Sequence, residues 1–120
     1  MKDILLELLD TLEKIGSTHG EIYDTDVREQ MFDAVYQGFI DPQPDYVLPE
    51  RFGLYDAEAN QLVRAALAKY IAGANEAAGA KGLLSPRARL AEFQKQGVYT
   101  TNEGQSGDEF FGWLAPSDLP

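Results

Sequence analysis

Apolar side chains recur every three or four positions along residues 3–15, which is the spacing of one face of an amphipathic α-helix. Acidic residues interrupt each apolar run, so we interpret the segment as a mature helix and not as a signal peptide. Gly16 is a natural helix end, and residues 16–20 (GSTHG) therefore predict a turn. The apolar face consists of Ile4, Leu5, Leu8, Leu9, Leu12 and Ile15.

A second helix is predicted from Asp24 or Thr25, either of which can cap it, to about Gly38. Asp26 and Glu29 in its first turn suit the positive end of the helix dipole. The apolar surface of this helix is broad, which predicts a central position in the fold. Its inner face is Val27, Met31, Ala34, Val35 and Phe39, and an adjacent stripe is Phe32 and Tyr36.

Residues 40–56 predict a long extended connector, because Pro42, Pro44 and Pro49 push the residues before them out of helical geometry. The segment is too apolar for a free linker, so we expect it to lie flat against the helices. Ordered loops of this length are often functional. Short strands remain an alternative for residues 46–55 and 97–101.

Asp56 predicts the start of a third helix over residues 57–72, and the pair Ser85-Pro86 predicts the start of a fourth that ends near Gln96. Between them, residues 73–82 (GANEAAGAKG) predict a flexible bend, since glycine weakens a helix. We expect Arg87 and Arg89 to solvate the start of the fourth helix. The expected inner faces are Leu62, Val63, Ala66, Leu67, Tyr70 and Ile71 on the third helix, and Leu90 and Phe93 on the fourth.

The pattern as a whole predicts a mainly α fold, with about four helices and the proline-rich connector in one compact domain of 120 residues. Residues 114–120 predict a loose end. Phe110, Phe111 and Trp113 precede it, and large apolar patches are rare on monomers. We therefore expect Phe110 or Phe111, together with Trp113, to dock on the helices as a lid. A partner-binding role for the exposed aromatics is the alternative.

The net charge of −10 is concentrated in the first half of the chain. Residues 1–60 hold 14 acids and 4 bases, whereas residues 61–120 hold 6 of each. Such a field repels nucleic acid and anionic membranes and speeds encounter with basic proteins. Solubility alone is the alternative explanation. The chain has no cysteine, which excludes disulfides and thiol chemistry and suits a reducing compartment, so we expect a cytoplasmic protein.

No constellation of catalytic residues emerges from the sequence. His19 is the only histidine, and Ser17 lies close to it, but nothing nearby supplies an orienting group or an oxyanion site. We therefore expect an exposed histidine in a turn. Residues 73–82 lack the spacing of a phosphate-binding loop, because Ala80 separates the second glycine from Lys81. Pairs of acids suited to general acid–base work arise by chance among 20 acidic residues.

Metal binding is not predicted either. Glu21, Asp24 and Asp26 lack the alternating ligands and central glycine of a calcium loop, and Arg28 stands where a further ligand would fall. Helix capping explains these acids better. The sequence thus predicts no metal and no cofactor.

No motif matches a named family. One small domain with a strongly acidic half and no catalytic constellation resembles, at the level of class, the small acidic cytoplasmic immunity proteins of bacteria. The resemblance implies a binding protein, not an enzyme, that occludes a basic toxin domain such as a nuclease. A carboxylate-dependent enzyme and a scaffold that binds through the aromatic tail are the alternatives. The expected partner-binding residues are Glu21, Asp24, Asp26, Glu29, Asp33, Asp45, Tyr46 and Glu50.

Overall fold

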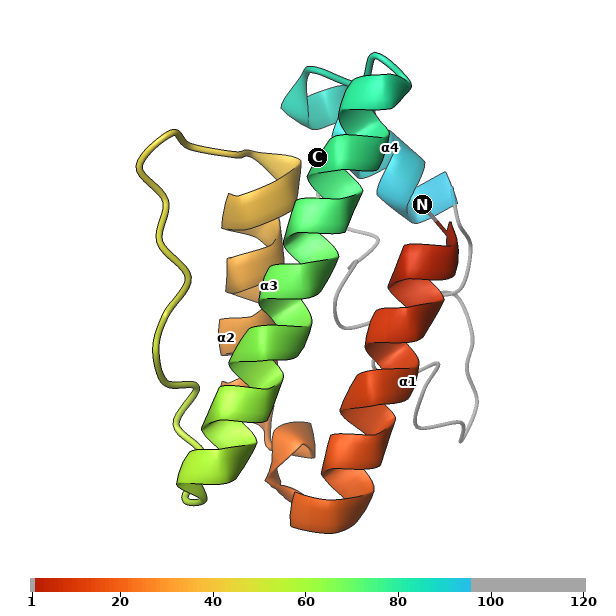
Figure 1. The fold of residues 1–120 in the computed structure, drawn as a ribbon. Coiled ribbons are helices and arrows are strands. Elements are labelled where there is room, and N and C mark those ends of the chain that lie inside the picture. Colours follow the sequence, from red (N-terminus) through yellow and green to blue (C-terminus); the bar gives the residue numbers. More distant parts are fainter. Residues whose placement is uncertain (1, 96–120) are drawn as a thin grey trace.

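Four α-helices make up most of the chain in the computed structural model, which describes residues 2–95 (Figure 1). They are α1 (Lys2–His19), α2 (Thr25–Val35), α3 (Ala57–Ala80) and α4 (Pro86–Lys95). A 3₁₀ turn, η1 (Glu21–Tyr23), precedes α2, and a π-helical turn, η2 (Tyr36–Ile40), follows it. Residues 2–95 contain no strand, so the mainly α fold with a long connector is confirmed. The alternative of a strand at 97–101 and the predicted docking of Phe110, Phe111 and Trp113 lie outside the described residues.

The direction of the helices explains the long connector. Figure 1 shows α2 and α3 running the same way, with α1 antiparallel to both. Short loops join antiparallel neighbours, so between two parallel helices the chain must return along the whole length of α2 before α3 begins. The sixteen residues 41–56 make this return in an extended form. The helix α3 contacts both α1 and α2, while α4 packs against η2.

The apolar core lies among the helices and agrees with most of the predicted inner faces. All five residues predicted for the inner face of the second helix are buried, four in α2 and Phe39 in η2, as are Leu90 and Phe93 of α4. On α3 the expected face is wrong at Leu62, which is 41% exposed, whereas the half-buried Ala66 and Ile71 pack against the core as expected. The buried hydrophobic residues of α1 and α3 are Leu5, Leu8, Leu12, Ile15, Ala59, Val63, Leu67, Tyr70, Ala74 and Ala78.

The first helix is longer than predicted. Gly16 lies buried inside α1, and the glycine that ends the helix is Gly20, which has a φ of 79°. Its N–H donates to the carbonyl of Gly16 at 2.7 Å, as expected for a residue in the left-handed conformation after a helix. The predicted turn over residues 16–20 is therefore helical up to His19.

The third helix also continues past the predicted end at residue 72, through the supposed bend, to Ala80. Tertiary contacts outweigh the weak helix propensity of its glycines. Ala74 and Ala78 are buried, and a Cβ on Gly73 would lie 3.5 Å from Ile4 Cδ1. The Asn75 side chain donates to the carbonyl of Gly38 at 2.9 Å. The bend is thus limited to Gly82, which has a φ of 77°.

The prediction that Arg89 solvates the start of α4 is wrong, because Arg89 is buried. Its Nη1 donates to the Phe39 carbonyl at 3.1 Å and to Asn75 Oδ1. The guanidinium also lies over the Phe39 ring, 5.5 Å from its centroid, a favourable arrangement for a cation. Arg89 therefore joins α4 to η2 and α3. Arg87 is exposed, as expected, and the Ser85 hydroxyl accepts from the Ala88 N–H at 3.1 Å.

Gly38 occupies the point where η2, α3 and the connector come together. A Cβ at this position would lie 2.9 Å from Ile71 Cδ1 and 3.2 Å from Tyr46 Cε2. Gly79 of α3 provides a comparison, because a Cβ added there would have no neighbouring atom within 4 Å.

We predict that Gly38→Ala destabilises the protein by about 1–3 kcal/mol, because the added methyl group overpacks this junction. Gly79→Ala stabilises it by up to about 1 kcal/mol, because alanine is the better helix former. Urea denaturation of both variants and the wild type measures the two changes. Equal changes in both variants would contradict the close packing around Gly38.

Candidate functional site

The last part of the connector is fixed to α3 by one buried side chain, that of Asn60. Its Oδ1 accepts from the Phe52 N–H at 2.7 Å and the Leu54 N–H at 3.4 Å. Its Nδ2 donates to the Leu54 carbonyl at 2.7 Å and the Asp56 carbonyl at 3.2 Å. Asn60 thus satisfies backbone groups that have no strand partner, while Phe52 and Leu54 fill the core beneath them.

Contacts farther back along the connector hold its middle. Arg64 of α3 donates from Nε to the Pro49 carbonyl at 3.1 Å and from Nη2 to the Leu48 carbonyl at 3.4 Å. The Tyr46 hydroxyl donates to the Ala34 carbonyl of α2 at 3.4 Å. The expectation that the connector lies flat on the helices holds for these residues, although Val47 is 75% exposed.

Three of the predicted partner-binding acids form one exposed face of α2. Asp26, Glu29 and Asp33 follow each other at spacings of three and four, so their side chains share one side of the helix. All three are exposed, and we name them the α2 acidic face. Asp24, also exposed, has a structural task, because its Oδ1 accepts from the Asp26 N–H at 2.9 Å and caps α2. The predicted cap is thereby confirmed.

The connector brings two further predicted residues beside this face. Burial and, after it, the charge of Asp33 raise the pKa of Tyr46, which places Tyr46 close to that end of the α2 acidic face. Asp45, the neighbour of Tyr46 in sequence, is exposed. Glu50 is exposed too, but it follows the two carbonyls that Arg64 of α3 holds. Glu50 therefore lies farther along the connector, on its way to α3.

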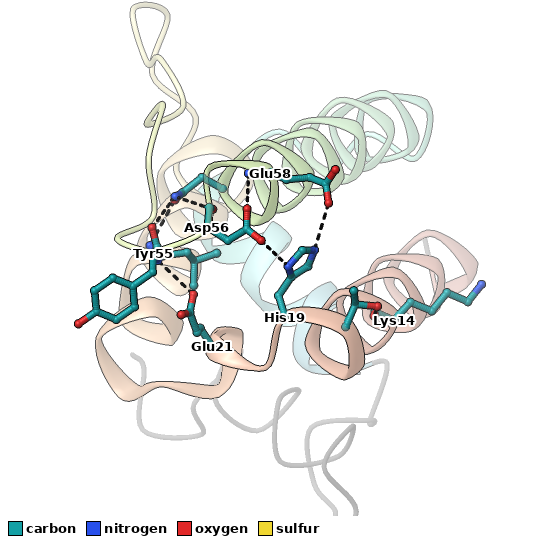
Figure 2. Close-up of polar contacts among 9 residues, drawn as sticks. Lys14, His19, Glu21, Tyr55, Asp56 and Glu58 are labelled. Atoms are coloured by element: carbon teal, nitrogen blue, oxygen red, sulfur yellow. Dashed lines mark hydrogen bonds and ion pairs between the residues drawn. The ribbon is translucent and has the colours of Figure 1, made fainter.

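The remaining predicted acid, Glu21, lies in η1 just before the Asp24 cap of α2, at the end of the domain where α1 ends and α3 begins (Figure 2). It is half-buried, and its Oε2 accepts from the Tyr55 N–H at 3.1 Å. Asp56 caps α3 as predicted, accepting from the Glu58 N–H at 2.8 Å. The connector is thus held both by Glu21 of η1 and by Asn60 of α3.

His19 belongs to the same end, and the prediction of an exposed turn histidine is wrong. Its side chain is only 10% exposed. Figure 2 shows its two ring nitrogens facing carboxylates of α3: Nδ1 lies 2.9 Å from Asp56 Oδ2 and Nε2 lies 3.6 Å from Glu58 Oε1. The last residue of α1 thereby contacts the N-terminal turn of α3. Ser17 does not join this contact, since its hydroxyl donates to the Lys14 carbonyl at 2.9 Å.

Tyr55, at the same end of the domain, is a candidate site residue that was not predicted from the sequence. It is 94% exposed, and Figure 2 shows its ring directed away from the helices. The residues before it are buried at Phe52 and Leu54 and turn at Gly53, which has a φ of 75°, whereas the Tyr55 side chain is left outside the core. No local pattern in the sequence signals this orientation, because it depends on the hydrogen bonds that Asn60 of α3 forms with Leu54.

Within residues 2–95, no group of three or more histidine, cysteine or acidic side chains could hold a metal ion. Over the same part of the chain, no helix has the length and apolar character needed to cross a membrane. Comparisons with known proteins found no matching family model, curated protein or solved structure. The exposed residues of α2 and the connector must therefore be interpreted from their own chemistry.

We predict that Asn60→Ala destabilises the protein by about 3 kcal/mol, because the Phe52 N–H and the Leu54 carbonyl lose their buried partner. Gln61→Ala, at an exposed neighbouring position of the same helix, is the control and changes stability by less than about 0.5 kcal/mol. Chemical denaturation measures both values. A similar small effect in both variants would show that Asn60 does not hold the connector.

Proposed function

We propose that this protein binds and occludes a basic protein partner in the cytoplasm, in the manner of an immunity protein that neutralises a toxin domain such as a nuclease. The observation that carries the proposal is Tyr55, an almost fully exposed aromatic ring on a backbone held from two sides. Glu21 accepts from its own N–H, and Asn60 binds both polar groups of the preceding Leu54.

A tyrosine presented in this way suits the centre of a protein interface. Tyrosine is enriched among the residues that dominate binding energy, because its ring has a large apolar area and the hydroxyl can form a hydrogen bond. A fixed backbone reduces the conformational entropy lost on binding. The contacts of Tyr55 within the protein involve its backbone, while its ring is exposed. A partner can therefore cover the ring without breaking any packing inside the protein.

The charge of the surrounding surface supports a basic partner. Asp24, Asp26, Asp56 and Glu58 are exposed at the starts of α2 and α3, which Figure 1 places at the same end of the domain. The α2 acidic face extends this negative surface along the helix. Such a surface attracts a basic protein and orients it during encounter, and the attraction weakens as salt screens it.

The proposal is tested by affinity capture from the native host, with wild-type protein and two variants as baits. Tyr55→Ser removes the exposed ring, and Asp26→Asn/Glu29→Gln/Asp33→Asn removes the charge of the α2 acidic face. We expect a basic protein that is retained by the wild type and lost or strongly reduced with either variant. Its association rate with the wild type should fall as salt is added.

Two controls match these changes elsewhere on the molecule. Val47→Ser removes another exposed apolar side chain of the connector. Asp3→Asn/Asp10→Asn/Glu13→Gln removes three exposed acids from α1. Both controls should retain the partner. If all four variants retain the same proteins as the wild type, or if the α1 variant loses the partner equally, the proposed surface is wrong.

A further inference from the structure

A groove of about 460 Å³ runs between α1 and α3. It lies on their outer side, because it exposes residues of α3 that do not belong to the buried face, such as Leu62 and Ala65. Ile4 and Leu8 of α1 form the opposite wall. The lining is mainly apolar, and Leu62 is one of the few exposed large apolar side chains among residues 2–95. An open apolar groove of this size favours an occupant with large side chains.

The charges around the groove differ from those of the rest of the surface. Two lysines, Lys14 and Lys69, line it together with one acid, Glu7, on a protein of net charge −10, so the groove is less negative than the rest of the surface. Lys69 Nζ lies 2.6 Å from Glu7 Oε1, and Lys14 Nζ lies 3.3 Å from Asp10 Oδ2. Both pairs are largely exposed to solvent and are therefore weak, so the lysines can interact with another acid.

The chain itself contains a segment with the complementary chemistry. Residues 108–114 (DEFFGWL) place two acids directly before two phenylalanines, and the only tryptophan follows. Its aromatic side chains can bury about 150–250 Å² each, whereas left in water they would form an adhesive patch. The two acids of the segment can contact the lysines of the groove. The aromatic rings that follow them can contact its apolar walls.

The chain that follows α4 is long enough for residues 108–114 to reach the groove. Arg89 of α4 binds Asn75, and Gly73, two residues away on α3, lines one end of the groove. After α4 ends at Lys95, residues 96–109 can span roughly 45 Å when extended. The length of α1 is only about 27 Å at 1.5 Å per residue. A segment on the same chain also has a high effective concentration at the groove.

We propose that residues 108–114 of this chain bind in the groove between α1 and α3, with Asp108 and Glu109 near Lys14 and Lys69 and with the Trp113 ring between the two helices. The groove is then an intramolecular binding site for an acidic aromatic segment. This binding does not involve the partner surface, which consists of Tyr55, the exposed acids at the starts of α2 and α3 and the α2 acidic face.

The absence of cysteine and the single tryptophan make a contact measurement possible in the full-length protein. A bimane fluorophore is attached to Ala65→Cys on the α3 wall or, separately, to Thr11→Cys on the α1 wall. Tryptophan quenches bimane only at near contact. We expect loss of most of the bimane emission at one or both positions, and recovery of the emission when Trp113→Phe is added.

Bimane on Ala80→Cys, about 22 Å farther along α3, and on Glu29→Cys of α2 provides the controls. Neither should be quenched by Trp113. The double variant Lys14→Gln/Lys69→Gln should reduce the quenching at position 65, because it removes the attraction for Asp108 and Glu109. Trp113-dependent quenching at neither groove position, or stronger quenching at position 29, would overturn the proposal. Quenching that disappears on dilution would also overturn it, since the segment would then come from a second molecule.

Discussion

The buried amide of Asn60 is the constraint on which the exposed surface depends. Sixteen residues without regular secondary structure must pass from the end of η2 to the start of α3, and their buried backbone groups need hydrogen-bond partners. Asn60 supplies four hydrogen bonds from within α3 to the last part of this connector. The same bonds fix the position of Tyr55, which follows Leu54 directly and has no packing of its own.

Because α2 and α3 run in the same direction, a long connector between them is necessary. Contacts at both ends of this connector fix its position. At one end, Gly38 allows Ile71 and Tyr46 to approach the backbone of η2 closely. At the other, Glu21 of η1 and Asn60 of α3 bind neighbouring backbone groups of the connector, while His19 links the end of α1 to the cap of α3. The surface that we assign to partner binding is thus a consequence of how the helices are connected.

Helical periodicity and capping chemistry predicted much of the fold. The inner face of α2, the caps at Asp56 and Ser85 and the extended connector all follow from local rules of residue type and spacing. The ends of α1 and α3 did not, because Gly16 is buried inside α1 and Gly73 of α3 lies close to Ile4 of α1, and such tertiary contacts are not contained in a local window of sequence. The burial of Arg89 and His19 likewise depends on partners 50 and 37 residues away. Of the site, the positions of the acids on α2 were predictable, but the exposure of Tyr55 required the contacts of Asn60.

Amide hydrogen exchange of Phe52 in the full-length protein tests most directly whether the connector is a fixed part of the fold. Its N–H is buried and donates to Asn60 Oδ1 at 2.7 Å, although it belongs to no helix or strand. If Asn60 fixes the connector, this amide exchanges nearly as slowly as core amides of α3 such as that of Leu67, and far more slowly than the amide of exposed Val47. Exchange of the Phe52 amide as fast as that of Val47 would contradict a fixed connector.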